Sequence, residues 1–353
     1  MTIMRAQHID EAVSLTTAAL RGVADRDWSV PAAGLDWSCY DTAVHVAGDF
    51  TAYAGQLAAR AADGWVPFEI TADPGTTPAG VVRIIEATGG ILSAAVATSP
   101  SEARAWHPYG AGGADAFAAM GVLEALVHTH DVLDGLGSAG WEPSAELCAA
   151  VLDRLFPHAP RTAAPWPTLL WATGRGDLPG LPRLAAWRWH ADPIRTERLV
   201  LCEISPVTGA ELKGGGTGGF AWTEDGPFEG TRFAGGMVAQ AKEAGTYRPG
   251  WGAYAIVRAA DGLAVGGIGF HAAPDGDGNA EIGYDLVPSA RGNGYATEAV
   301  RALAAWALAQ RGLTTLHATV DDDNLASHAV LGRAGFTRAG AGEGQVRYTR
   351  TGV

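Results

Sequence analysis

Lysine is almost missing from this sequence of 353 residues, which contains only Lys213 and Lys242. Acidic residues outnumber lysine and arginine by 38 to 25, and the formal net charge is −13. Nucleic acids and anionic membranes are bound by basic surfaces, so this charge argues against both kinds of partner. The sequence therefore predicts neither a nucleic-acid-binding protein nor a membrane-surface protein.

Cysteine is scarce as well, with Cys39, Cys148 and Cys202 scattered along the chain without the spacing of a metal or redox motif. Such sparse usage is typical of a reducing compartment. The first ten residues lack the basic and then apolar plan of a signal peptide, and we expect no apolar run long enough to cross a bilayer. These absences predict a cytoplasmic protein, and 353 residues suffice for two domains with separate cores.

The first half of the chain shows helical periodicity, because apolar residues recur at intervals of three and four in four separate stretches. Ser38 with Asp41 forms a capping box at the start of the second stretch, and Gly137 follows the fourth. The stretches cover residues 9–23, about 38–62, 78 to about 98, and about 115–136. Four amphipathic helices with modest connections predict an all-α four-helix bundle.

Three polar side chains fall on helix faces that we expect to be buried: His45, Glu124 and His128. Glu124 and His128 are four residues apart, so they lie one above the other on the same helix. With a histidine from a second helix, this pair could ligate a metal and leave coordination positions open. Spacing alone nevertheless favours hydrogen-bonded core residues, because that is the usual role of a buried histidine.

Residues 35–45 and 124–131 resemble the two metal-bearing blocks of the mycothiol-dependent maleylpyruvate isomerase N-terminal domain, within the DinB-like superfamily. The resemblance covers about residues 5–190 and implies a metal-binding bundle, of a kind that in some members uses a low-molecular-weight thiol. It implies that His45, Glu124 and His128 hold a divalent metal, for which zinc suits two imidazoles and a carboxylate. His130 and Asp131 remain alternative ligands, with Asp131 favoured as a group behind the ligands.

A stretch with many tryptophans, prolines and arginines follows at residues 166–190. Aromatic and arginine side chains can line a groove for single-stranded nucleic acid, but the acidic net charge argues against that use. We expect this stretch to wrap the bundle as a tail. Pro193 then marks the boundary between domains at residues 1–190 and 194–353.

The second half contains a strand-like run, Glu281–Val287, that leads through Pro288 into a glycine-rich loop and a helix from about residue 297. A loop of this kind leaves backbone N–H groups unpaired at a helix N-terminus, where the helix dipole adds positive charge. Such a terminus can bind a pyrophosphate. The loop consists of Arg291, Gly292, Asn293, Gly294, Tyr295 and Ala296, and it lacks the lysine of a nucleotide-triphosphate loop.

Arg291-x-x-Gly294-x-Ala296 fits the pattern [QR]-x-x-G-x-[GA] and resembles the acetyl-CoA loop of the GNAT family of N-acetyltransferases. Further blocks in the family's order lie at residues 196–201, 266–270 and 324–336, so the resemblance covers about residues 194–350. Residues 294–299, GYATEA, resemble the ribosomal-protein-acetyltransferase-like subgroup. The resemblance implies an α/β domain with a mixed, mostly antiparallel sheet, helices on both faces, and two central strands that splay around acetyl-CoA.

Acetyl transfer requires a polarised thioester carbonyl and an amine that loses a proton. The backbone N–H groups near Leu286 and Val287 are our candidates for polarising the carbonyl. Glu281 is the candidate base, acting directly or through water, although a structural pair with an arginine would explain it as well. Tyr284 is expected either to face the acceptor or simply to pack.

The leaving thiolate needs a proton, which many GNAT members supply from a tyrosine in the segment before the Gly-Phe pair. Leu331 stands at that position here, so the usual acid is missing. Ser327 is the substitute that we expect to donate to the sulfur. Asn324 is expected to hold the pantetheine arm.

Three functions follow from these observations and stay open at this point. The first is an acetyl-CoA-dependent N-acetyltransferase that acts on an amine of a small molecule or peptide. The second is a metal- and thiol-dependent transferase or isomerase centred on the N-terminal bundle. The third is a small-molecule-binding resistance protein. The acceptor and the oligomeric state are not encoded in any motif, and we expect acceptor specificity to lie in loops between Val207 and Tyr247.

Overall fold

The structure is a computed structural model, and it describes residues 3–62, 64–160, 163–181, 183–184, 189–190 and 193–352. The chain divides into two compact units. The first comprises Met1–Phe156 and Thr162–Pro179, and the second comprises Pro157–Arg161 and Gly180–Val353. Residues 157–160 thus group with the second half of the chain, although they precede the predicted boundary.

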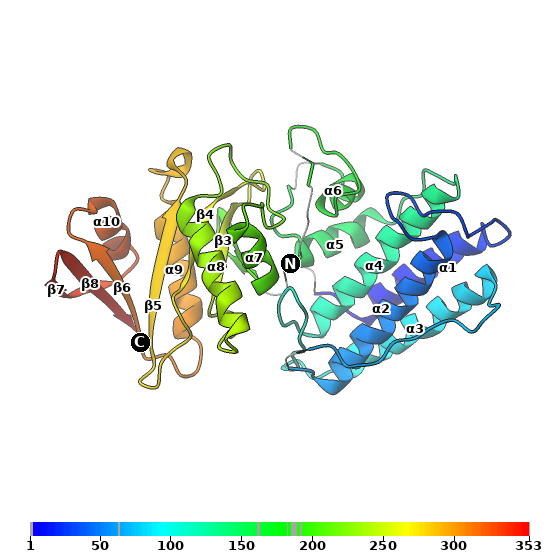
Figure 1. Ribbon diagram of the computed structural model, residues 1–353, viewed down its shortest axis with the longest axis horizontal. Helices are drawn as coiled ribbons and strands as arrows, with labels where there is room; N and C mark the ends of the chain where they lie inside the picture. Colours follow the sequence, from blue (N-terminus) through cyan, green and yellow to red (C-terminus); the bar gives the residue numbers. More distant parts are fainter. Residues whose placement is uncertain are drawn as a thin grey trace. The chain divides into compact units, whose positions relative to one another are not determined.

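The first unit is built around four helices that run side by side: α1 (Ala6–Arg21), α2 (Cys39–Ala59), α3 (Pro78–Thr98) and α4 (Ala114–Gly135) (Figure 1). The prediction of an all-α four-helix bundle is confirmed. Most of α4 is buried, because the other three helices all contact it. Glu124, His128 and Asp131 of this helix therefore lie inside the bundle.

Local sequence signals fix where these helices begin. The Ser38 side chain accepts a hydrogen bond from the Asp41 N–H at 3.0 Å, which caps α2 as expected. Thr77 caps α3 in the same way, with Pro78 at the first helical position. After α4 the chain turns at Gly137, whose φ of 70° suits a residue without a side chain.

Helix α3 is more apolar than we expected from the sequence. An 18-residue window within Pro78–Thr98 has a mean hydropathy of 1.5, which is long and apolar enough to cross a membrane by composition alone. In the structure the helix packs against α1 and α2, and 44% of the window is buried. We therefore describe α3 as a bundle helix.

The described part of the first unit contains two further helices: α5 (Ala145–Leu155) and α6 (Pro165–Ala172). Neither was predicted. Helix α6 lies in the tryptophan-rich stretch and buries Trp166 and Trp171, so this part of the tail packs on the bundle as a short helix. Several residues between 182 and 192 lie outside the described part of the chain.

The second unit contains one eight-stranded sheet in the order β1-β2-β3-β4-β5-β6-β8-β7. Every neighbouring pair is antiparallel except β5 and β6, which are parallel. The predicted mixed, mostly antiparallel sheet is confirmed. The strands are Ile194–Arg195 (β1), Leu199–Glu203 (β2), Ala253–Arg258 (β3), Ala264–Phe270 (β4), Asn279–Leu286 (β5), Thr315–Asp321 (β6), Thr337–Gly342 (β7) and Gln345–Thr351 (β8).

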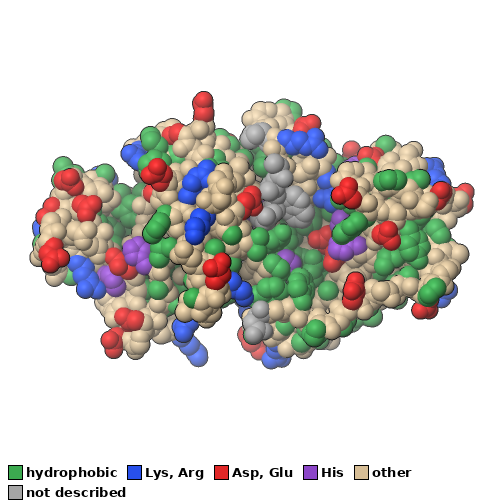
Figure 2. All heavy atoms as spheres, in the orientation of Figure 1, with side chains coloured by type: hydrophobic (Ala, Val, Ile, Leu, Met, Phe, Trp, Pro, Cys, Tyr) green, Lys and Arg blue, Asp and Glu red, His purple; other side chains and the backbone are tan. Residues whose placement is uncertain are grey.

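Helices cover both faces of this sheet, as predicted (Figure 1). Helices α9 (Tyr295–Leu308) and α10 (Leu325–Arg333) share one core, and α7 (Pro206–Lys213) and α8 (Glu229–Glu243) share the other. Strand β2 alternates between the cores, with Leu201 in the first and Cys202 in the second. On the face drawn in Figure 2, arginines and lysines are scattered singly among acidic side chains.

The segment between Val207 and Tyr247, where we expected specificity loops, is mainly helical, because it forms α7 and α8. The two helices approach closely at Gly209 and Gly235. A Cβ atom added to Gly209 would lie 2.2 Å from the Gly235 carbonyl oxygen. On this face the second unit therefore presents a packed helix pair, with the loop 214–228 between the two helices.

Candidate active site and metal centre

Strands β5 and β6 separate after a short contact, and this opening is the first feature of the candidate active site. Their parallel pairing involves only Asn279–Glu281 and Thr315–His317, at the start of both strands. Beyond these residues β5 continues to Leu286 while paired only with β4. The predicted splay of two central strands is thus present.

The register of β4 and β5 decides which backbone groups face this opening. The Val287 N–H donates to the Val265 carbonyl at 3.0 Å, and the His271 N–H donates to the Glu281 carbonyl at 3.0 Å. In an antiparallel ladder the residues between such pairs direct their N–H and C=O groups to the other side. Tyr284 and Leu286 therefore present their amides toward the opening. The prediction for Leu286 fits this geometry, whereas Val287 already uses its N–H within the sheet.

The glycine-rich loop lies at the end of β5 and leads into α9. Gly292 and Gly294 have φ of 77° and 80°, and Gly294 is the N-cap of the helix. A Cβ atom on Gly294 would approach only the Arg198 guanidinium, at 3.4 Å, so the space above this residue is largely open. Exposed N–H groups at an uncluttered helix N-terminus match the predicted pyrophosphate cradle.

The remaining loop residues brace this terminus. Asn293 donates through its side chain to the Ala290 and Arg291 carbonyls at 3.1 Å, and the Arg291 Nε donates to the Leu286 carbonyl at 3.2 Å. Arg198 donates to the Asn293 carbonyl and stacks over the Tyr295 ring. Ala296 is buried beneath them. The loop is therefore held in shape by its own side chains and by Arg198.

Arginines gather beside the loop although the protein as a whole is acidic. Arg198, Arg301 and Arg333 line a groove together with Gly294 and Glu298. The Glu298 carboxylate accepts from the Arg198 Nε at 2.8 Å and from the Thr196 hydroxyl at 2.6 Å, which fixes the first of these arginines. This local positive charge favours an anionic ligand at the start of α9. The role of Arg198 was not predicted.

A cavity of about 320 Å³ opens on the other face of the sheet, beside α8. Its wall is mainly apolar, with Phe233, Met237 and Trp251 among the larger side chains. His271 and Asp285 add polar groups near β5. A pocket with an apolar body and few polar groups is typical of a small-molecule site.

Glu281 lies on β5 between two histidines. Its carboxylate is 3.4 Å from the His271 Nδ1 and 3.7 Å from the His317 Nε2, and its side chain is 28% exposed. Burial lowers the pKa of His317, which favours the neutral ring. No arginine pair of the kind we had considered involves Glu281 among the ion pairs of the described residues. The carboxylate is therefore accessible from the same face as the pocket-lining His271.

The far wall of the opening is formed by α10. The Asn324 side chain accepts from the Ser327 N–H at 3.1 Å, so Asn324 caps the helix, a role that we had not assigned to it. Ser327 is half-buried, and its carbonyl accepts a hydrogen bond from the Tyr284 hydroxyl at 3.4 Å. Leu331 is fully buried in the core. Hydroxyl groups are therefore available at Ser327 and Tyr284, and none at position 331.

The first unit brings His45, Glu124 and His128 together, as predicted. Their nearest ligand atoms all lie within 4.8 Å of one another, and the centroids of the two imidazole rings are 5.2 Å apart. Two imidazoles and one carboxylate from two helices form a suitable donor set for Zn²⁺. The residues therefore fit the metal implied by the resemblance.

Groups behind these ligands hold them in place. The Asp131 carboxylate lies 3.0 Å from the His128 Nδ1 and forms a bidentate ion pair with Arg175 at 2.7–3.1 Å. Burial opposes charge on His128, but the bonds to Asp131 and Glu124 outweigh it and raise its pKa to about 9. Carboxylates in this position orient metal-bound histidines. Asp131 thus lies behind His128, the place that we favoured for it, and the ion pair with Arg175 was not predicted.

Two other residues refine the predicted set. The His130 ring packs against Trp166 with centroids 5.6 Å apart, and it is not part of the cluster. Asp49, one turn after His45 on α2, places a carboxylate oxygen 3.0 Å from the His45 Nε2. Its i, i+4 spacing could have been recognised in the sequence. Asp49 is therefore a further candidate ligand or a partner of His45.

Comparisons with known proteins match the two halves of the chain to two different families. Residues 228–337 match the family model described as acetyltransferase (GNAT) domain, and residues 9–133 match the mycothiol maleylpyruvate isomerase N-terminal domain. The uncharacterized N-acetyltransferase YoaA of Bacillus subtilis (strain 168) is 37% identical over 76 residues, 22% of this chain and 43% of the relative. The uncharacterized N-acetyltransferase YjdG of the same organism is 37% identical over 87 residues, 25% and 52% of the two chains.

The chain spans about half the length of the curated relatives that it matches. Among solved structures, a GNAT-family acetyltransferase from Bacillus anthracis is 21% identical and covers 45% of this chain and 98% of its own, with a TM-score of 0.33. The chain thus combines an N-terminal domain of the mycothiol maleylpyruvate isomerase N-terminal family with a C-terminal domain of the GNAT acetyltransferase family.

Proposed function

We propose that the protein is an acetyl-CoA-dependent N-acetyltransferase that modifies an amine of a small molecule or peptide. One observation carries the proposal: the opening between β5 and β6 lies next to an exposed helix N-terminus whose surroundings are rich in arginine. A ligand that carries both a thioester and a pyrophosphate would place the thioester in the opening and the pyrophosphate at the helix N-terminus. Acetyl-CoA, when bound, supplies the activated acetyl group.

The chain's own residues supply binding, polarisation and proton transfer. The N–H groups of the loop from Arg291 to Ala296 bind pyrophosphate, and the Leu286 N–H hydrogen-bonds a carbonyl oxygen in the opening. Glu281 accepts the proton that the amine loses, directly or through a water. Ser327 donates a proton or a hydrogen bond to the departing sulfur. Asn324, at the start of α10, lies beside Ser327 on the wall where the pantetheine arm would run.

The cavity beside α8 is the proposed acceptor site. His271 lies in its wall and within 3.4 Å of Glu281, so an amine bound there would be near the proposed base. Phe233, Met237 and Trp251 favour an acceptor with an apolar body next to its amine. A panel of aryl- and alkylamines, amino sugars and short peptides, tested with acetyl-CoA, would show which class is acetylated.

The metal cluster supports a second candidate function for the N-terminal domain, a metal- and thiol-dependent transferase or isomerase. His45, Glu124 and His128 leave coordination positions for a substrate. A low-molecular-weight thiol would be the expected co-substrate. Activity of the chain on a thiol conjugate, lost after chelation of the metal while acetylation persists, would assign this reaction to the bundle.

The zinc site in the bundle leads to a specific prediction. His128→Ala is expected to lower the zinc content of the full chain by one ion, because the central ligand is lost. Asp131→Asn should keep the ligands but weaken zinc binding by about 10- to 100-fold, because it loosens His128. His130→Ala is the matched control, since its ring packs on Trp166 outside the cluster. Elemental analysis after incubation with zinc measures all three; equal zinc in His128→Ala and wild type would refute the site.

The proton donor can be tested by removing single hydroxyl groups. Ser327→Ala is expected to lower kcat about tenfold, which corresponds to roughly 1.4 kcal/mol of lost stabilisation. Tyr284→Phe is the comparison, because its hydroxyl reaches the Ser327 carbonyl while its ring packs against the core. Steady-state rates with a saturating acceptor decide between them. A larger loss in Tyr284→Phe than in Ser327→Ala would transfer the role to Tyr284.

A further inference from the structure

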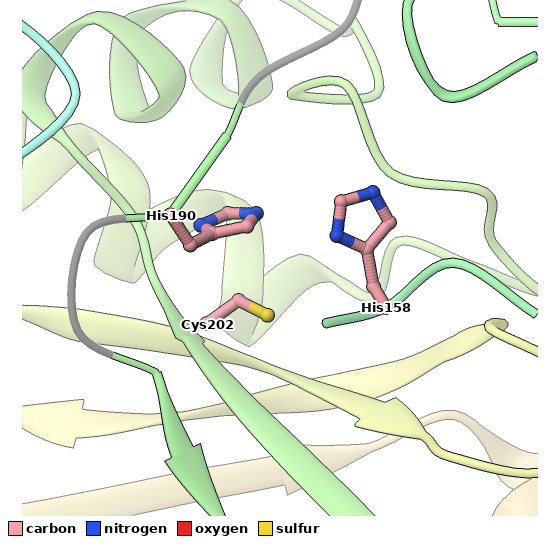
Figure 3. Close-up of side chains that lie close together, drawn as sticks. All are labelled: His158, His190 and Cys202. Atoms are coloured by element: carbon pink, nitrogen blue, oxygen red, sulfur yellow. The ribbon is translucent and has the colours of Figure 1, made fainter. Parts of the chain in front are cut away.

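The second unit contains a cluster of metal-binding residue types that lies apart from both sites described above. His158, His190 and Cys202 come from three separate chain segments, and all three side chains are buried. Their nearest ligand atoms lie within 4.8 Å of one another. Figure 3 shows the two imidazole rings and the sulfur directed into the same space. We propose that these residues form a zinc site that fastens the connecting segments to the sheet of the GNAT domain.

The donor types point to zinc. Two imidazole nitrogens and one thiolate sulfur favour borderline and soft metals, whereas Ca²⁺ and Mg²⁺ prefer oxygen ligands. Zinc bonds of about 2.0–2.3 Å place neighbouring ligand atoms roughly 3.5 Å apart. Side-chain rotations that move the ligand atoms by about 1 Å would therefore bring the three residues into bonding distance of an ion. Three protein ligands leave one tetrahedral position for a water or another group. The cluster is thus close to the required geometry.

The surroundings hold the two histidines in place before any metal binds. The Phe220 ring stacks on His190 at a centroid distance of 5.2 Å and an interplanar angle of 20°, and its edge contacts His158. His190 also has a hydrogen bond with the backbone of Glu203, the residue after Cys202. An imidazole that bonds a backbone group through one nitrogen typically offers the other to a metal. The rings are therefore oriented by contacts outside the cluster.

Gly262, in the turn between β3 and β4, fixes the segment that carries His158. A Cβ atom on Gly262 would lie 2.2 Å from the His158 carbonyl oxygen, so backbone meets backbone at this point. The residue also has a φ of 72°, which glycine adopts without strain. Because of this contact, residues 157–160 can lie directly on the turn that joins β3 and β4. The position of His158 is thus determined by the fold of the second unit.

Cys202 lies near the end of β2, on the face that packs against α7 and α8. Its neighbours in that core include Phe220, Val238 and Ala255. Burying two imidazoles and a thiol beside such residues has a desolvation cost, which coordination to a metal offsets. A zinc ion here would join two connecting segments to β2. The first carries His158 and precedes α6, and the second carries His190 and precedes Pro193. Its role would be structural, because all three ligands are enclosed.

The test uses the full chain and Co²⁺ as a spectroscopic substitute for zinc. A thiolate bound to Co²⁺ gives a charge-transfer absorption in the near ultraviolet, and the bundle site contains no cysteine. The band therefore distinguishes the proposed site from the bundle site. We expect wild type to show the band and Cys202→Ala to lack it. Cys148→Ala, which removes another buried cysteine, is the matched control and should keep it.

Elemental analysis provides the second measurement. In a His128→Ala background, which removes the bundle site, the chain should retain one zinc ion after gel filtration. Adding His158→Gln, which keeps the volume of the side chain and lies outside the strand, should remove that ion. Circular dichroism confirms that each variant is folded. The proposal is overturned if folded wild type gives no thiolate–cobalt band, or if the retained zinc is unchanged in both His158→Gln and Cys202→Ala.

Discussion

Replacing Glu281 with glutamine is expected to lower the acetylation rate at neutral pH by about 100-fold, which corresponds to roughly 3 kcal/mol of activation free energy. The substitution keeps the shape of the side chain and removes the group that accepts the proton of the amine. CoA affinity should change little, because the loop at the start of α9 is separate from Glu281 along β5. Fixed-time assays of acetyl transfer, with the acceptor at a saturating concentration, measure the effect.

Asp277→Asn is the control for this experiment. It makes the same carboxylate-to-amide change in the turn before β5, where Asp277 is exposed. Its rate should equal that of wild type. If Glu281→Gln keeps its rate within a factor of about three, less than 1 kcal/mol of the barrier depends on the carboxylate, and Glu281 is not the base. His271 would then be the next residue to test, because it lines the same cavity.

Gly294→Val is expected to weaken CoA binding by about 100-fold or more, roughly 3 kcal/mol of binding free energy. A valine at this position would have to adopt a φ of 80°, which is strained for a β-branched side chain. Its side chain would also fill the open space above the helix N-terminus, where backbone N–H groups should contact the pyrophosphate. Isothermal titration of CoA into the full chain gives the affinity.

Gly276→Val serves as the matched control, because a Cβ atom there meets nothing within 4 Å and the residue lies in the exposed turn before β5. It should bind CoA like wild type. Circular dichroism of Gly294→Val shows whether the domain remains folded. A folded Gly294→Val variant that binds CoA within threefold of wild type would mean that the pyrophosphate lies elsewhere.

Local patterns were enough to predict the local structure of those parts of the candidate site whose residues lie close together in the sequence. The loop from Arg291 to Ala296 was recognised because its glycines and the following helix are adjacent in the chain. The same holds for α3, whose start at Pro78 was predicted to the residue and whose end was predicted at about Thr98, since proline favours the first position of a helix. The proximity of Glu124 and His128 was predictable because the two residues are about one helical turn apart.

Features that depend on tertiary contacts were missed. Arg175 lies 44 residues after Asp131, so no local signal connects the two. Whether the Val287 N–H points into the opening or bonds β4 depends on how β4 and β5 are aligned. The sequence of β5 alone does not define that alignment. Cys202 was set aside because its neighbours in sequence include no second ligand at a recognisable spacing. The fold brings His158 and His190 to it from other segments.

The most direct test of the central claim is transfer of an acetyl group from acetyl-CoA to an amine by the purified full chain. Mass spectrometry of the acceptor panel, with free CoA thiol measured in parallel, is the measurement. We expect at least one amine to gain a single acetyl group with stoichiometric thiol release, and both signals to fall in Glu281→Gln and in Gly294→Val. Thiol release at the uncatalysed rate with every amine, by a folded chain that also fails to bind CoA, would contradict the assignment.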